Sequence, residues 1–214
     1  MKLYLAPLEG ITNHIYRKAL YECFGGFDKY FIPFIRAKQN LNFSGREKKD
    51  IDPENNQGMY AVPQILTRNA EDFLRTASQL AGLGYREINL NLGCPSKTVV
   101  TKGCGAGFLE RPDELECFLD HIFANTDLKI SIKTRLGMDD AEEFEDLLEI
   151  YNRFPLEELI VHPRVQKDFY KNVPNLEAFE YVVQKSKNPL CYNGDIFSAE
   201  DFAKVQERFP SVDC

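Results

Sequence analysis

The chain has 214 residues, of which 43% are hydrophobic and 28% are charged, and no break in composition divides it. These values predict one domain over residues 1–214 with a single sizeable core. The lack of an apolar run of about 20 residues argues against a membrane protein, so we expect a soluble, cytoplasmic protein. The net charge of −7 counts, taken alone, against a nucleic-acid partner. Six scattered cysteines and only three histidines indicate neither a disulfide framework nor a metal site, so reduced thiols are expected.

Short apolar runs rich in β-branched residues alternate along the chain with longer segments of helical period. This alternation is typical of repeated βα units and predicts a parallel sheet. Helix starts are indicated at Asn69, Pro112 and Ser198, each followed by acidic residues. The polar stretch Ala37–Gln57 is expected to be a long surface loop with some helical content. The seven expected strands are Leu3–Pro7, Lys29–Phe34, Tyr60–Leu66, Glu87–Leu92, Lys129–Arg135, Glu158–His162 and Pro189–Asn193.

Nearly every expected strand ends in residues that are unusual for a buried strand. Glycine, proline, asparagine and charged side chains stand there, as in 91–95, 133–135 and 193–195. Active sites of βα barrels lie at the carboxyl ends of the strands, so this clustering favours an α/β fold of the TIM-type (β/α)8 barrel class, here incomplete with about seven strands. A doubly wound open sheet is the alternative, but polar ends on six successive strands fit a closed ring better than a single crevice.

The most specific stretch is Ile88–Pro95 (INLNLGCP), followed by Val99 and by Gly105-Ala106. It closely resembles the signature of the tRNA-dihydrouridine synthase family, and the resemblance extends to the other strand ends over the whole chain. In that family reduced FMN passes a hydride to C6 of a uracil in tRNA, while the loop cysteine protonates C5. The resemblance implies an oxidoreductase with FMN as cofactor, tRNA as substrate and Cys94 as the general acid.

The chemistry of a cysteine agrees with this role for Cys94. A thiol has an ordinary pKa of about 8.5 and is mostly protonated at neutral pH, so it can give up a proton without special tuning. Gly93 and Pro95 suit a tight turn that presents the sulfur outward. An isolated cysteine would more often be a small buried apolar residue, and the cysteines in helical or strand patterns are interpreted in that way.

Charged side chains at the ends of the fifth and sixth strands have further implied roles. The family uses the lysine that matches Lys133 for FMN, where an ammonium would stabilise negative charge on the reduced ring. A strand-end lysine can also simply reach solvent. Arg135 matches a substrate-binding arginine, and the pair of His162 and Arg164 matches residues near the flavin and its phosphate or the bound nucleotide. The plain alternative for His162 is an ordinary rim histidine.

Other strand ends supply the remaining implied contacts. Gln64 matches a glutamine that hydrogen-bonds the isoalloxazine ring, and Asn91 is assigned to the substrate. A glycine after the seventh strand permits close backbone approach to a phosphate, although a plain Asn-Gly turn is the alternative. No GxGxxG or Walker motif is present, so NADPH, the implied reductant, would reach the flavin from the open rim. The FMN contacts expected after the first and seventh strands are Pro7, Leu8, Glu9, Asn193, Gly194 and Asp195.

The charges are distributed unevenly. Acidic residues crowd the segment 139–149, which is most simply a solvated helix face. Basic residues instead follow the strands, which places them on the expected catalytic side. This placement is compatible with an RNA backbone and equally with the phosphates of FMN and NADPH. The basic residues are Arg36, Lys38, Arg46, Lys48, Lys49, Lys97, Lys102, Arg135, Arg164, Lys167 and Lys171.

The sequence departs from the family pattern at its carboxyl end. Residues 210–214 stand where an eighth strand would start, without the Gly-Arg phosphate turn and the C-terminal helical domain of the family. We therefore expect a truncated product with weakened FMN and tRNA affinity, and self-association through open barrel edges. Two further hypotheses are a related FMN barrel that acts on a free pyrimidine, and a catalytically silent fragment.

Overall fold

The computed structural model describes residues 1–37 and 42–214. In this part of the chain, seven strands form one sheet whose order follows the sequence, and each neighbouring pair is parallel. The strands are β1 (Tyr4–Leu5), β2 (Lys29–Arg36), β3 (Ala61–Leu66), β4 (Glu87–Leu92), β5 (Lys129–Arg135), β6 (Glu158–His162) and β7 (Leu190–Tyr192). This sequential parallel order confirms the incomplete TIM-type barrel, and the doubly wound alternative is wrong.

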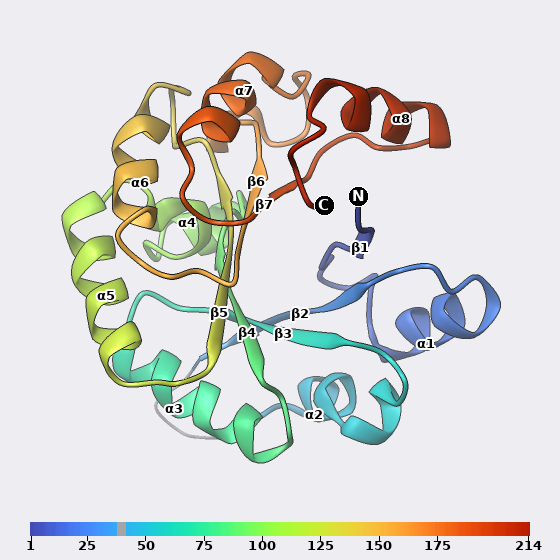
Figure 1. Ribbon diagram of the computed structural model, residues 1–214. Coiled ribbons are helices and arrows are strands. Elements are labelled where there is room, and N and C mark those ends of the chain that lie inside the picture. Colours follow the sequence, from blue (N-terminus) through green and yellow to red (C-terminus); the bar gives the residue numbers. More distant parts are fainter. Residues whose placement is uncertain (38–41) are drawn as a thin grey trace.

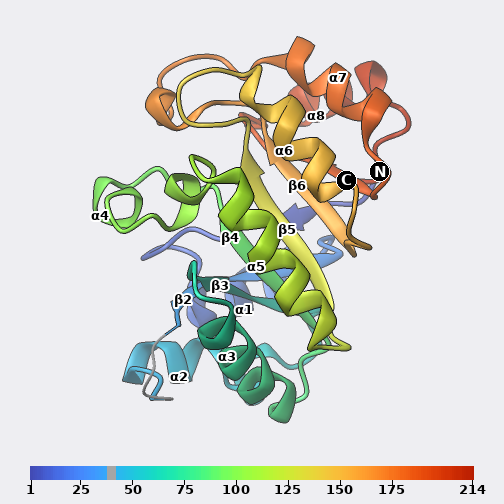
Figure 2. The same cartoon turned by 90° about the vertical axis from the view of Figure 1, so that its left-hand side faces the viewer.

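Most helices stand between successive strands in the chain and lie around the outside of the sheet (Figure 1), and the last one follows β7. Figure 2 shows α5 crossing in front of β4 and β5. The α-helices are α1 (His14–Cys23), α2 (Gly45–Ile51), α3 (Ala70–Gly82), α4 (Lys97–Val100), α5 (Pro112–Ala124), α6 (Glu143–Tyr151), α7 (Leu176–Lys185) and α8 (Ala199–Arg208). Three short 3₁₀ helices are η1 (Pro53–Asn56), η2 (Gly105–Phe108) and η3 (Gln166–Asp168).

The predicted helix starts are confirmed, two of them by capping contacts. The side chain of Asn69 accepts a hydrogen bond from the main-chain N–H of Asp72 at 2.8 Å, and Ser198 accepts one from Asp201 at 3.1 Å. Pro112 is the first residue of α5, where its missing N–H leaves no helical hydrogen bond unmade. Capping residues followed by acidic side chains therefore located these helices correctly.

In the stretch Ala37–Gln57, the described residues are more ordered than the expected surface loop. Its described part contains both α2 and η1, and a capping box in which Ser44 and Glu47 bond each other's backbone starts α2. Residues 38–41, including Lys38 of the expected basic rim, lie outside the described residues. The helical content that the sequence suggested is thus the main feature of the described segment.

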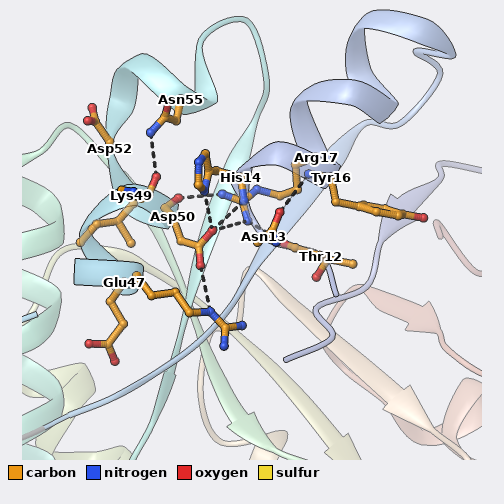
Figure 3. Close-up of polar contacts among 12 residues, drawn as sticks. Thr12, Asn13, His14, Tyr16, Arg17, Glu47, Lys49, Asp50, Asp52 and Asn55 are labelled. Carbon is orange, nitrogen blue, oxygen red and sulfur yellow. Dashed lines mark hydrogen bonds and ion pairs between the residues drawn. The ribbon is translucent and has the colours of Figure 1, made fainter. Parts of the chain in front are cut away.

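A buried network fastens α2 and η1 to the start of α1 (Figure 3). Arg17, fully buried, donates to the carbonyls of Thr12 and Asp50 at 2.7 and 2.6 Å and to the Asn56 side chain at 2.9 Å. The Asp50 carboxylate accepts from the main-chain N–H of His14 at 2.6 Å. Because Thr12 Oγ1 also accepts from the N–H of Leu8 at 2.9 Å, this network fixes the turn that follows β1.

The amino ends of the strands carry a second buried polar group, opposite the rim where the site is expected. Lys29 of β2 lies 3.1 Å from a carboxylate oxygen of Glu87 on β4 and 3.5 Å from one of Glu158 on β6. Tyr60 donates to Glu87 and Tyr4 to Glu158. Alternate strands thus supply one layer of the interior, as in closed βα barrels.

The two ends of the described sheet are separated by the residues at the carboxyl end of the chain. The N–H of Lys2 donates to the carbonyl of Asp213 at 2.7 Å, and that of Tyr192 donates to the carbonyl of Cys214 at 2.8 Å. Both chain ends accordingly meet between β1 and β7 (Figure 1). Cys214 forms a disulfide with Cys191 of β7. The expectation of reduced thiols is wrong for this pair, because β7 and the last residues lie side by side although 23 positions separate them in sequence.

Candidate active site

A large cavity opens between the first turn of the barrel and the ends of β6 and β7. Its volume is about 1160 Å³, which is enough for a ligand of cofactor size. Eight of the predicted site residues are among those that line it: Pro7, Leu8, Lys133, His162, Arg164, Asn193, Gly194 and Asp195. The carboxyl ends of four strands are therefore brought to one hollow, as the strand-end pattern predicted.

Cys94 follows β4 on a loop whose shape depends on its neighbours. The Asn91 carboxamide oxygen accepts from the N–H groups of Gly93 and Cys94 at 3.1 and 3.0 Å. Gly105, at a φ of +57°, packs beneath this turn, and a Cβ there would lie 2.9 Å from the Cys94 carbonyl oxygen and 2.9 Å from Val99. Glycine is required there because both the conformation and the close approach exclude a side chain.

Two side chains from other elements hold the same loop. Arg135 donates from Nε to the carbonyl of Gly93 at 3.0 Å, and its other nitrogens donate to the carbonyls of Val165 and Phe169 at 3.0 and 2.7 Å. Gln166, on η3, donates from Nε2 to the carbonyl of Pro95 at 3.0 Å. The cysteine loop is thus joined to the segment that follows β6.

Burial raises the pKa of the half-buried Cys94 thiol, and nearby Glu9 raises it further. The N–H of Ser96 and the positive charges of Arg36 and Arg135 act in the opposite direction without cancelling the rise. A thiol whose pKa lies above its usual range is protonated at neutral pH. Cys94 is consequently in the protonation state that a proton donor needs.

Lys133 presents a half-buried ammonium to the cavity. Burial, together with the positive charge of Arg135, lowers its pKa to about 8, while Cys94 acts in the opposite direction. Among the described residues no carboxylate forms an ion pair with it. An unpaired cation in this position is available to an anionic group of a ligand.

His162 is neutral in this environment. Burial and the positive charges of Lys133, Arg135 and Arg164 lower its pKa to about 2. Its Nε2 lies 2.9 Å from Nη1 of Arg164, and because a guanidinium can only donate, Nε2 accepts and the ring proton is on Nδ1. The buried ring therefore offers an N–H donor from Nδ1.

Arg164 connects β6 to the turn after β7. It donates to both carboxylate oxygens of Asp195 at 2.8 and 2.5 Å, and its Nε donates to the carbonyl of Asn172 at 2.5 Å. Asp195 has a φ of +46°, a left-handed conformation that is uncommon outside glycine. A Cβ on Gly194 would lie 3.4 Å from the His162 ring, so glycine keeps this turn close to the site.

Gln64 and Asn91 belong to a hydrogen-bonded row across the barrel interior. Asn91 donates to Gln64 Oε1 at 2.7 Å, Gln64 donates to Asn89 at 2.7 Å, and Asn89 donates to Ser131 at 3.0 Å. All four side chains are buried. The row supports the cysteine loop from below through Asn91.

The structure thus divides the predicted residues into two groups. Lys133, His162, Arg164 and the turns after β1 and β7 line the cavity. Gln64, Asn91, Arg135 and Cys94 are instead bonded to other residues or lie on the tethered loop. Glu9 is exposed on the turn that also contains Pro7 and Leu8. Sequence reasoning missed Asn89, Ser131 and Gln166; for Asn89, an asparagine two residues before Asn91 on a buried strand was the available signal.

Residues 1–37 and 42–214 contain no group of three His, Cys, Asp or Glu side chains arranged to hold a metal ion. Within the same ranges, no helix is both long and apolar enough to cross a membrane.

Comparison with known proteins identifies the family. The family model described as "Dihydrouridine synthase (Dus)" matches residues 4–209. The chain is 28% identical to a tRNA-dihydrouridine(16) synthase of Cupriavidus necator over 96% of the chain and 66% of that relative. It is 29% identical to a probable tRNA-dihydrouridine synthase of Staphylococcus aureus over 96% of the chain and 64% of that relative. The chain spans about two thirds of the length of these relatives. With its family model matched over nearly all of its length and its strand-end residues around one cavity, the chain belongs to the dihydrouridine synthase family.

Proposed function

We propose that the protein is a flavin-dependent enzyme that reduces uridine to dihydrouridine in tRNA, with Cys94 as the proton donor to C5 of the uracil. One observation carries the proposal. A protonated Cys94, on a loop whose backbone is held by hydrogen bonds, lies near the cation of Lys133, which lines a cavity of cofactor size. The printed names of the relatives from Cupriavidus necator and Staphylococcus aureus support tRNA as the substrate.

The cavity suits FMN in size and in chemistry. Apolar walls from the turn after β1 face the unpaired ammonium of Lys133, and the turn after β7 offers backbone that a side chain at Gly194 would crowd. When bound, FMN would supply a hydride for C6 of the uracil. We infer that the residues that hold it are Pro7, Leu8, Glu9, Gln64, Lys133, His162, Asn193, Gly194 and Asp195.

The chain's own residues account for the proton. A hydride received at C6 would leave one negative charge on the uracil. The Sγ–H bond of Cys94 would break as a C–H bond forms at C5, and the transferred proton would neutralise that charge. The thiolate left behind regains its proton from solvent. Because the thiol pKa is raised, Cys94 remains a donor through neutral pH and loses activity only as the pH rises above that pKa.

The partners follow from the same chemistry. We infer NADPH as the reductant, tRNA as the macromolecular substrate contacted by Asn91, Arg135 and Arg164, and the cytoplasm as the location. Self-association through the edges of β1 and β7 is part of the proposal, because these two strands are not paired with each other in the described sheet.

Mass spectrometry of tRNA nucleosides tests the proposed function. A strain that lacks the gene should lose dihydrouridine at one or more tRNA positions and regain it with the wild-type gene. Cys94→Ala should not restore it, whereas Cys104→Ala, on the same loop, should. Undiminished dihydrouridine in a strain without other members of the family would refute tRNA reduction, and full restoration by Cys94→Ala would refute the assigned donor.

A further inference from the structure

The backbone of the cysteine turn has a partner for each of its hydrogen-bonding groups. The N–H groups of Gly93 and Cys94 donate to Asn91, and the carbonyl of Cys94 accepts from the N–H of Ala106 at 3.1 Å. The carbonyl of Gly93 accepts from Arg135, and that of Pro95 accepts from Gln166. Proline has no N–H, so the turn 93–95 is completely satisfied.

The contact from Gln166 reaches this turn from the far side of β5. Its own backbone is held, because the N–H of Gln166 donates to the carbonyl of Gly137 at 2.9 Å and that of Lys167 to the carbonyl of Met138 at 3.1 Å. The loop that provides these carbonyls is anchored in turn by Glu143, whose carboxylate accepts the N–H groups of residues 138–140 at 2.8 to 2.9 Å. The backbone that carries the Gln166 side chain is therefore held in place by hydrogen bonds.

We propose that Gln166 is a positioning residue for Cys94: by holding the Pro95 carbonyl it keeps the turn closed and the thiol half-buried. The proposal rests on the proposed function only in giving Cys94 its catalytic purpose. Arg135 also holds the turn, but it is buried and bonds three carbonyls, so its removal would disturb the fold as well. Gln166 is half-buried, and its side chain holds the turn through one bond, so its contribution can be separated from folding.

Loss of this donor has a defined effect on the thiol. Without this donor, the Pro95 carbonyl could form a hydrogen bond only with water. The turn would therefore open more often to expose this carbonyl. In the open form the thiol is hydrated, so the rise in its pKa that burial causes would shrink. Cys94 should then react faster with an alkylating agent, and its reactivity should begin at lower pH.

The test is the alkylation rate of each cysteine by iodoacetamide, followed by peptide mass spectrometry on the purified full chain. Gln166→Met keeps the length of the side chain and removes the donor, and we expect Cys94 to react about fivefold faster in this variant, the magnitude of one lost hydrogen bond. Cys104, half-buried on the same loop, serves as the internal reference. Gln206→Met, at an exposed position of α8, is the matched control and should leave the rate unchanged.

A second variant separates positioning from a general loss of structure. Gln166→Lys retains an N–H donor of similar reach and should restore most of the protection of Cys94, whereas Gln166→Glu, which has none, should behave like Gln166→Met. A wild-type Cys94 rate and pH profile in both Gln166→Met and Gln166→Glu would overturn the proposal, as would equal acceleration of Cys104 and Cys94. Neither FMN nor tRNA is needed, so a failure of the proposed function would be seen separately.

Discussion

Lys133 differs from Arg164, which follows the neighbouring strand β6, in having no acidic partner among the described residues. Its pKa of about 8 means that the ammonium is present at neutral pH and is lost as the pH rises through 8. We expect FMN binding to weaken about tenfold between neutral pH and about pH 9, and Lys133→Met to bind weakly at both. Fluorescence titration with FMN measures this, with Lys185→Met on α7 as control. Equal pH dependence in wild type and Lys133→Met would contradict the assignment.

For individual residues, the sequence predicted the positions of the polar side chains at the strand ends but not their hydrogen-bond partners. The strand-end positions of Arg135 and Arg164 were evident, and both suggested contacts with a ligand. The structure shows their donors engaged by main-chain carbonyls and by Asp195. Apart from Asn172, which lies on the same segment as Arg164, these partners lie on loops after other strands. Their proximity therefore depends on the curvature of the sheet, which no local pattern encodes.

Among the elements, α1 and α2 depend on one buried arginine. Arg17→Met keeps the apolar stem of the side chain but removes its donors, so the Thr12 carbonyl and Asn56 Oδ1 lose their bonds to Arg17, and the Asp50 carbonyl keeps only the one from Asn56. We expect a loss of about 3 kcal/mol in the free energy of unfolding, measured by urea denaturation. Arg46→Met, on the exposed side of α2 with a 3.8 Å contact to Asp50, should cost less than about 1 kcal/mol. Similar losses in both variants would contradict the role of the network.

The buried carboxylate of Glu158 on β6 lowers the stability of the protein when it is charged. Burial raises its pKa despite the nearby ammonium of Lys29, and one of its carboxylate oxygens has no hydrogen-bond donor. A raised folded-state pKa means that the charged form opposes folding above the unfolded-state pKa, and the penalty vanishes as the pH falls below that value. Glu158→Gln should therefore stabilise the protein at neutral pH and do so by less near pH 4, in urea unfolding experiments. The neighbouring Glu157→Gln should show no such gain.

Helices and strands with clear apolar periodicity or capping residues were predicted well. Elements whose position depends on contacts between distant parts of the chain were not. All seven strands and the helix starts at Asn69, Pro112 and Ser198 follow from apolar periodicity and capping chemistry. The helix α2 is short and highly charged, so its apolar pattern is weak, and its position depends on Arg17, which lies in a different element. Propensity alone could not reveal that contact.

For the whole molecule, the barrel class could be predicted because each βα unit repeats the same pattern, and repetition fixes the order of a parallel sheet. The disulfide between Cys191 and Cys214 could not, because it depends on the last residues lying between β7 and β1. The apolar cluster around it joins Phe31 and Val62 to Ile160 across the interior. Contacts across the two ends of the sheet thus exist without direct pairing of β1 and β7.

That arrangement makes self-association sensitive to the disulfide. While Cys214 is bonded to Cys191, the last residues occupy the N–H groups of Lys2 and Tyr192 and cover part of both strand edges. Reduction or Cys214→Ser should release this segment, expose the edges of β1 and β7 and increase the dimer fraction severalfold in sedimentation velocity experiments. Cys23→Ser, an exposed free cysteine at the end of α1, should sediment like the wild type. If reduced protein and Cys214→Ser stay as monomeric as the oxidised chain, the covered edges are not the association surface.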